Sequence, residues 1–282
     1  MASYNTLITT EQLEGIIGNV FVFDTRFDLT DPELGERAFK KAHIPGAQYL
    51  HLDHDLSGAK NGRNGRHPLP SPEVFENRLR ALGLNYRQQV VVYDDQGGIF
   101  AARAWWLLRS LGHTEVAVLN GGLSAWLSAG KPIAGMTQEA SLGTFIRRGS
   151  ANTTIDYSEL YNDITGQRLL TVVDARSPQR FAGQNETLDA KAGHIPGALN
   201  RFYMENLDSQ GFFKPSSQLS QEFSDLLGSR PKSSIVHQCG SGVTACHNIL
   251  AMEVAGLGAP RLYAGSWSEW SSLPGSPVEA DG

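Results

Sequence analysis

The sequence has little cysteine, since only Cys239 and Cys246 occur among its 282 residues. Two cysteines cannot build a disulfide framework, and their spacing fits no common zinc-binding pattern. We therefore expect the chain to be in a reducing compartment. A formal net charge of −5 gives no reason to expect a nucleic-acid partner. With 40% hydrophobic and 19% charged residues, the composition is that of an ordinary globular protein.

Long apolar runs are also missing. No run approaches the roughly 18 residues that a membrane-spanning helix needs. The opening segment MASYNTLITTEQLEGI contains Glu11 and Glu14 but no arginine, no basic region and no apolar core. This composition is unlike that of a signal or transit peptide. We therefore expect a cytoplasmic protein with no membrane partner.

What the sequence does contain is a repeat of itself. FVFDTR at 21–26 recurs as TVVDAR at 171–176, and AHIPGA at 42–47 recurs as GHIPGA at 193–198. Two further landmarks recur in the same order: VVYDDQGGIF and IVHQCGSGVT (91–100 and 235–244), and NGGLSAW and AGSWSEW (120–126 and 264–270). Such agreement predicts two copies of one domain rather than a single large domain.

The polar, small-residue-rich stretch between the copies places the domain boundaries. We predict a first domain of residues 1–137, a linker of residues 138–150 and a second domain of residues 151–282. Within each copy, short apolar runs that read as buried strands alternate with helical patterns. The stretch from Ser71 is typical of a helix start, because Pro72 follows a good N-cap residue. The prediction is an α/β fold in which each domain has a mainly parallel sheet with helices on both faces.

The segment CGSGVTA lies where a ligand site is expected, directly after a predicted buried strand. Gly240 and Gly242 permit a tight loop, and a helix is expected to begin near Val243 or Thr244. Backbone N–H groups of such a loop, together with the helix N-terminus, would favour an anionic sulfur or a bound oxyanion. The alternative is that Cys239 is an inert, buried core residue.

Comparison of the two copies favours the reactive interpretation. In the first copy the position that lines up with Cys239 is Asp95, and a carboxylate would be costly to bury in a core. We therefore interpret the position as part of a pocket and the second copy as the active one. Cys246 lines up with Ala102 and is expected in the core. A cysteine-dependent phosphatase would need arginine six residues after its cysteine, where this chain has Ala245.

These motifs carry a resemblance to a known family. DARSPQRF, GHIPGA, the cysteine loop and AGSWSEW, each present twice in outline, resemble the rhodanese-type sulfurtransferases over essentially the whole chain. The loop GSGVTA is similar to that of the 3-mercaptopyruvate sulfurtransferases. Thiosulfate-preferring rhodaneses usually carry Arg-Lys where this chain has Gly240 and Ser241. The resemblance implies tandem rhodanese-like domains, with no cofactor and no metal.

The resemblance also implies a mechanism. Cys239 would take sulfur from a small anionic donor, hold it as a persulfide and pass it to a thiol or cyanide acceptor, with a thioredoxin-like protein as one candidate. The loop residues Gly240, Gly242, Val243 and Thr244 would bind the anionic groups. 3-Mercaptopyruvate is the expected donor. Thiosulfate, or a role as a persulfide carrier for sulfur-using biosynthesis, is the alternative.

In the mercaptopyruvate branch of the family, a serine two residues after the cysteine works with a histidine and an aspartate. The matching residues are Ser241, His67 and Asp53, with Asp55 or His54 as alternatives for the third position. Such a relay could assist proton transfer as the enolate of pyruvate leaves. The alternative for the histidine is that it only caps a loop.

Donor binding requires cationic groups, and the resemblance assigns one of them to Arg180. The mercaptopyruvate branch usually has a second arginine nine residues later, where this chain has Asp189. Lys191 is a candidate substitute. A basic segment next to the predicted histidine is another source of positive charge, although a solvated loop is the simpler interpretation of it (Lys60, Arg63 and Arg66).

Overall fold

The computed structural model describes residues 3–135, 140–150 and 152–280, which form two compact units. The first unit consists of the described residues of Met1–Gly58, Leu69–Ala151 and Ser209–Phe213. The second consists of Ala59–Pro68, Asn152–Asp208 and the described residues of Lys214–Gly282. Each unit therefore includes a short segment from the other half of the sequence. The start of the predicted linker, at residues 138 and 139, and residue 151 lie outside the described residues.

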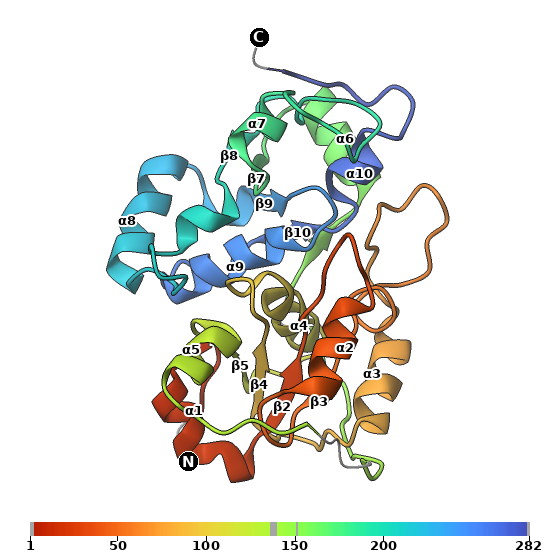
Figure 1. Cartoon of the computed structure of the whole chain (residues 1–282). Coiled ribbons are helices and arrows are strands. Elements are labelled where there is room, and N and C mark those ends of the chain that lie inside the picture. The colour runs from red at the N-terminus through yellow and green to blue at the C-terminus, as the bar shows by residue number, and fades with distance from the viewer. Residues whose placement is uncertain (1–2, 136–139, 151, 281–282) are drawn as a thin grey trace. The chain divides into compact units, whose positions relative to one another are not determined.

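The first unit is built on a five-stranded parallel sheet of order β1-β5-β4-β2-β3. Its strands are β1 (Leu7–Ile8), β2 (Phe21–Asp24), β3 (Gln48–Tyr49), β4 (Val90–Tyr93) and β5 (Val116–Leu119). Its helices are α1 (Thr10–Ile16), η1 (Ile17–Asn19), α2 (Leu34–Lys41), α3 (Pro72–Ala81), α4 (Ile99–Ser110) and α5 (Gly122–Ser128) (Figure 1). The predicted start of α3 is confirmed, because the Ser71 side chain accepts a hydrogen bond from the Val74 N–H.

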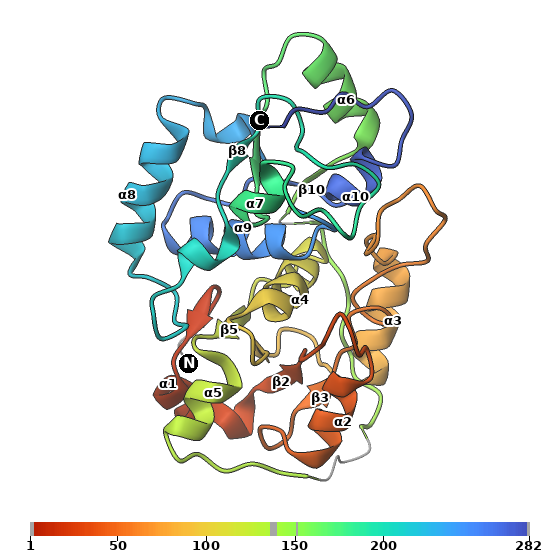
Figure 2. The same cartoon turned by 45° about the horizontal axis from the view of Figure 1, so that its top comes forward.

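The second unit repeats this topology with the order β6-β10-β9-β7-β8, again all parallel. Its strands are β6 (Thr154–Ile155), β7 (Thr171–Asp174), β8 (Leu199–Asn200), β9 (Ile235–Gln238) and β10 (Arg261–Tyr263). Its helices are α6 (Tyr157–Thr165), α7 (Pro178–Phe181), η2 (Tyr203–Asn206), α8 (Ser216–Leu227), η3 (Lys232–Ser234), α9 (Thr244–Val254) and α10 (Ser266–Trp270) (Figure 2). The predicted duplication of an α/β domain is confirmed.

Helices cover each sheet with apolar side chains. In the first unit α1, α2 and α5 contribute Leu13, Phe39 and Trp126 to one core cluster on the sheet. In the second unit α6 and α10 do the same, and α9 packs against β9 with α8 beside it. All five tryptophans are buried, as expected for packing residues (Trp105, Trp106, Trp126, Trp267 and Trp270). Within the described ranges, no helix combines the length and apolar character needed to cross a membrane.

The repeated D-x-R motif is structural in both units. Arg26 forms an ion pair with Asp24 at 2.7 Å, and it also donates to the Ala42 carbonyl. Arg176 forms the same 2.7 Å pair with Asp174 and donates to the carbonyl of Gly193, the first residue of GHIPGA. All four side chains are buried, and each arginine charge is neutralised by the aspartate with which it pairs. The motif therefore ties the end of a strand to the loop that follows it.

The structure corrects the pairing of the two cysteine-loop positions. Strands β4 and β9 have four residues each and pair with β2 and β7 in the same register. The residue directly after the strand is Asp94 in the first unit and Cys239 in the second. The alignment with Asp95 was therefore wrong by one residue. The same shift makes Ala101 the counterpart of Cys246, and the small, buried character expected of that position holds.

Asp94 also corrects the physical argument that was built on the comparison. Its side chain is completely buried, yet its carboxylate accepts hydrogen bonds at 2.8–3.0 Å from four backbone N–H groups (Gln96, Gly98, Phe100 and Ala101). A carboxylate at this position does not mark a pocket rim. It fills a cradle of N–H donors, which shows that the loop after this strand is built to surround an anion.

Replacing Asp94 by alanine should destabilise the protein by at least about 2 kcal/mol, because buried N–H donors would lose their acceptor. The matched control is Asp95→Ala, which removes an exposed carboxylate next to it and should cost less than about 0.5 kcal/mol. Urea unfolding of both variants measures the difference. Equal stability of the two variants would contradict the cradle described for Asp94.

Candidate active site

Hydrogen bonds to residues 266–268 hold the first two residues of the loop that carries Cys239. The Cys239 N–H donates to Ser266 Oγ at 3.1 Å, and its carbonyl accepts from the Trp267 N–H at 2.9 Å. The next carbonyl, that of Gly240, accepts from the Ser268 N–H at 2.9 Å. The start of α10 thus holds the loop at the carboxyl edge of the sheet, where parallel α/β folds place their ligand sites.

The thiol sulfur lies among backbone donors. Cys239 Sγ accepts from the Gly242 N–H at 3.1 Å and from the Ser241 N–H at 3.5 Å. Gly242 has φ of +79°, and a Cβ there would lie 2.4 Å from the Ala264 carbonyl oxygen. Only glycine therefore lets the loop turn this donor toward sulfur. The predicted cradle is present at these two residues.

Helix α9 begins directly beyond this turn. Val243 is its N-cap and Thr244 its first residue, as the sequence predicts. Among the described residues, no side chain caps this terminus. The first N–H groups of a helix have no partner within it and attract negative charge. Of the positions predicted to bind anionic groups, Gly242 donates to the thiol sulfur, and Val243 and Thr244 follow it at the start of the helix.

Burial does not distinguish Cys239 from a core cysteine, because Cys239 is only 2% exposed. The hydrogen-bond partners of the sulfur do distinguish the two cysteines. Cys239 Sγ accepts from backbone N–H groups, whereas Cys246 Sγ donates to the Gly242 carbonyl at 3.3 Å from inside α9. An N–H cradle stabilises sulfur that carries negative charge, and a thiol donating to a carbonyl oxygen has no such stabilisation.

Ser241 connects the cysteine loop to the predicted histidine. His67 Nδ1 and Ser241 Oγ are 2.8 Å apart, and both side chains are buried. This contact lies within the second unit, because residues 59–68 belong to it. Asp53 belongs to the first unit, where its N–H donates to His51 Nδ1 at 3.1 Å. The structure thus brings together Cys239, Ser241 and His67 in one unit.

The segment around His67 is anchored by backbone contacts. The Arg66 N–H donates to Ser268 Oγ at 3.0 Å. Gly65 has φ of +79°, and a Cβ there would lie 2.6 Å from the Gly265 carbonyl oxygen. The close approach explains a glycine immediately before the arginine and histidine. The segment therefore contacts α10, the helix that also holds the cysteine loop.

Arg180 lies beside Gly240 of the loop, in a network of carboxylates. Its Nε and Nη2 donate to Glu186 at 2.9–3.1 Å, and Nη2 also donates to Asp189 at 2.9 Å. Asp189 forms a second ion pair with Arg66. Lys191 is exposed, and its carbonyl accepts from Trp267 Nε1. Sequence reasoning missed Glu186 and gave Arg66 no specific role.

The two carboxylates respond differently to this network. Burial alone would raise the pKa of Glu186, but hydrogen bonds from the Leu188 N–H and from Arg180 lower it below its ordinary value. Burial raises the pKa of Asp189, against the attraction of Arg66 and Arg180 and with the repulsion of Glu186. Asp189 is thus the carboxylate whose negative charge is less well stabilised.

The sequence model of the Rhodanese-like domain family matches residues 9–129 and 156–273. The chain belongs to the rhodanese-like family. Each match falls on one copy of the repeat and covers the strands of its sheet other than β1 and β6.

The names of proteins related to this rhodanese-like chain refer to two different sulfur donors, 3-mercaptopyruvate and thiosulfate. A Pseudomonas aeruginosa protein named "Probable 3-mercaptopyruvate sulfurtransferase" is 46% identical over 96% of this chain and 97% of its own length. A Gallus gallus protein named thiosulfate sulfurtransferase is 33% identical over 82% of this chain and 79% of its own. The solved structure of a 3-mercaptopyruvate sulfurtransferase from Leishmania major is 30% identical, with a TM-score of 0.85 over 97% of this chain and 76% of that chain.

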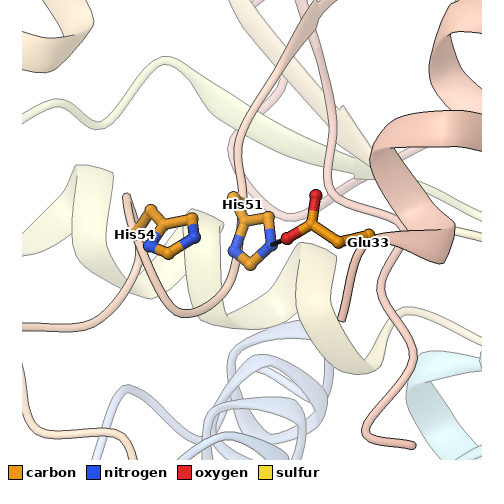
Figure 3. A group of neighbouring side chains, drawn as sticks. All are labelled: Glu33, His51 and His54. Atoms are coloured by element: carbon orange, nitrogen blue, oxygen red, sulfur yellow. Dashed lines mark ion pairs between the residues drawn. The ribbon is translucent and has the colours of Figure 1, made fainter. Parts of the chain in front are cut away.

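One further cluster in this rhodanese-like chain resembles a metal site. Glu33, His51 and His54 of the first unit place one ligand atom each within 4.8 Å of the others (Figure 3). His51 Nδ1 accepts the Asp53 N–H at 3.1 Å, and His51 Nε2 faces Glu33 at 4.0 Å. A neutral imidazole that binds a metal through Nε2 carries its proton on Nδ1, where it would face the Asp53 N–H. The Asp53 contact therefore disfavours a metal ion on His51 Nε2.

Proposed function

We propose that this rhodanese-like chain is a sulfurtransferase that moves sulfur from 3-mercaptopyruvate through a Cys239 persulfide to a thiol or cyanide acceptor, releasing pyruvate. The observation that carries the proposal is the position of Cys239 Sγ. This sulfur accepts hydrogen bonds from the backbone N–H groups of Ser241 and Gly242, and the Ser241 hydroxyl contacts His67. A nucleophile, an anion cradle and a group that can transfer protons thus lie on one loop.

The first half of the reaction is a nucleophilic substitution at sulfur. The Cys239 thiolate attacks the sulfur of the donor, forming the S–S bond as the C–S bond breaks. The electron pair of that bond leaves as the enolate of pyruvate, which takes up a proton. The N–H groups of Ser241 and Gly242 and the start of α9 stabilise the negative sulfur before and after transfer.

Ser241 and His67 are proposed to move that proton. The donor's thiol proton can pass through the Ser241 hydroxyl and the His67 imidazole to the carbon of the departing enolate. This route balances the step, because it leaves a persulfide anion and neutralises the enolate carbon. Asp53 is proposed, on the family resemblance, to orient His67, and Asp53→Asn tests that role.

The second half of the reaction regenerates the free Cys239 thiolate. A thiolate or cyanide attacks the outer sulfur of the Cys239 persulfide, and the cysteine thiolate leaves. A thioredoxin-like protein is a candidate acceptor because it offers a reactive thiol. Two free cysteines suit a reducing compartment, and we propose the cytoplasm.

Thiosulfate is the second candidate donor, because on the family resemblance an acidic residue at the position of Asp189 is typical of thiosulfate-preferring rhodaneses. We expect 3-mercaptopyruvate to give the larger kcat/KM, because Gly240 and Ser241 provide a small, neutral loop that reaches His67. Steady-state kinetics of the purified protein with each donor and cyanide decide the matter. Equal values, or a larger value for thiosulfate, would contradict the proposed donor.

A further inference from the structure

Two guanidinium groups lie against the residue that follows the nucleophile. A Cβ placed on Gly240 would be 2.8 Å from Arg66 Nη2 and 3.4 Å from Arg180 Nη1. The two arginines come from segments far apart in the sequence, yet both reach the same backbone position. A side chain at position 240 would therefore have to shift the ends of both arginine side chains.

Each arginine binds the surrounding carboxylates through only some of its guanidinium nitrogens. Arg180 bonds Glu186 and Asp189 through Nε and Nη2, and Nη1, which makes none of these bonds, is the atom nearest to Gly240. Arg66 pairs with Asp189 through Nη1, and Nη2 is nearest to Gly240. Two N–H-bearing nitrogens therefore approach one point next to Cys239.

The carboxylate of Asp189 shows what this pair of arginines can bind. One oxygen pairs with Arg66 and the other with Arg180, so a single carboxylate bridges two guanidinium groups. Asp189 is 2% exposed at its side chain, whereas Arg66 and Arg180 are 31% and 23% exposed. The arginines are thus open to a solute, while their internal counter-ion is not.

We propose that Arg66 and Arg180 together bind the carboxylate of the donor, and that Asp189 is an internal carboxylate that holds both arginines in position and competes with the donor for them. The inference rests on the proposed function, because it requires a donor with a carboxylate. It makes Arg66 a substrate-binding residue and Asp189 a residue that sets donor affinity.

The geometry is suited to a carboxylate. Planar guanidinium groups bind carboxylates with two parallel hydrogen bonds, and Asp189 already presents its oxygens to both arginines. The surrounding charges balance, since Arg66 and Arg180 face Asp189 and Glu186. A donor must therefore share or replace the contacts of Asp189 rather than enter a field of excess positive charge.

The test compares Arg66→Ala with Arg63→Ala, which removes an exposed arginine from the same segment. Arg66→Ala should raise KM for 3-mercaptopyruvate about 10- to 100-fold with little change in kcat, because it removes a charge-assisted contact made before the reaction begins. Arg66→Lys should recover part of the loss, since it keeps the charge without the fork. Arg63→Ala should match the wild type.

A binding measurement separates this inference from the proposed function. Pyruvate, which carries the same carboxylate, is titrated calorimetrically into Cys239→Ser protein with and without Arg66→Ala. We expect the second substitution to weaken pyruvate binding by the factor seen in KM. Unchanged pyruvate affinity and KM would overturn the role of Arg66. Failure of the wild type to use 3-mercaptopyruvate at all would instead overturn the donor assignment.

Asp189→Asn tests the competing carboxylate. It removes the negative charge but keeps the size of the side chain, so KM for 3-mercaptopyruvate should fall about 3-fold or more. A rise in KM would overturn the competition and leave Asp189 as a positioning residue only.

Discussion

Sulfur transfer is expected to fall to background in Cys239→Ser, with both 3-mercaptopyruvate and thiosulfate as donor. A serine hydroxyl is not ionised at neutral pH and cannot hold the transferred sulfur as a persulfide, so both half-reactions lose their nucleophile. The fold should remain, because serine is close in size to the buried thiol and the loop is held by backbone bonds to α10. Formation of thiocyanate from cyanide measures the loss.

The matched control for this substitution is Cys246→Ser, seven residues further along the chain. Cys246 is buried in α9 and donates to the Gly242 carbonyl, a bond that a serine hydroxyl can also make. We expect transfer to stay within a few-fold of the wild type. Transfer that survives in Cys239→Ser, or that is lost equally in both variants, would contradict the assigned nucleophile.

The second large effect is expected in His67→Ala, and it should depend on the donor. With 3-mercaptopyruvate, kcat should fall about 100-fold or more, because a general acid–base group contributes about 10²–10⁴-fold to proton transfer. With thiosulfate the loss should be below about 10-fold. Sulfite leaves as a stable anion and needs no proton, so the Ser241–His67 contact has little to supply.

The donor dependence is what identifies the relay. Ser241→Ala, which removes the hydroxyl bonded to His67 but leaves the Ser241 backbone N–H in place, should show the same preference in a weaker form. Arg63→Ala removes an exposed side chain from the same segment as His67 and serves as the control. A uniform loss with both donors in His67→Ala would point to a structural histidine that only holds residues 59–68.

Much of the fold could be predicted from the sequence, because its signals are local. Four-residue apolar runs such as Val90–Tyr93 became strands at the expected positions, and Ser71 with Pro72 began a helix. The repeat predicted two copies of one domain, and the two sheets indeed have equivalent strand orders. The strand before Cys239 and the start of α9 at Thr244 also agree with prediction.

The errors and omissions concern contacts that local patterns do not contain. The sequence comparison paired Cys239 with Asp95 instead of the adjacent Asp94, and the strand register shows that Asp94 is the counterpart. Asp189 was noted as a departure from the family pattern, but nothing in its neighbourhood indicates Arg66, which lies 123 positions earlier. Such ion pairs depend on the path of a loop, and sequence periodicity does not encode that path.

The central claim is that Cys239 holds sulfur as a covalent intermediate, and intact-protein mass spectrometry tests it most directly. Wild-type protein is mixed with 3-mercaptopyruvate without an acceptor, its mass is recorded, and the modified residue is located by peptide mapping. We predict a gain of one sulfur atom on Cys239, lost again when cyanide is added and absent from Cys239→Ser. Turnover without any added sulfur, or sulfur located on Cys246, would contradict the account.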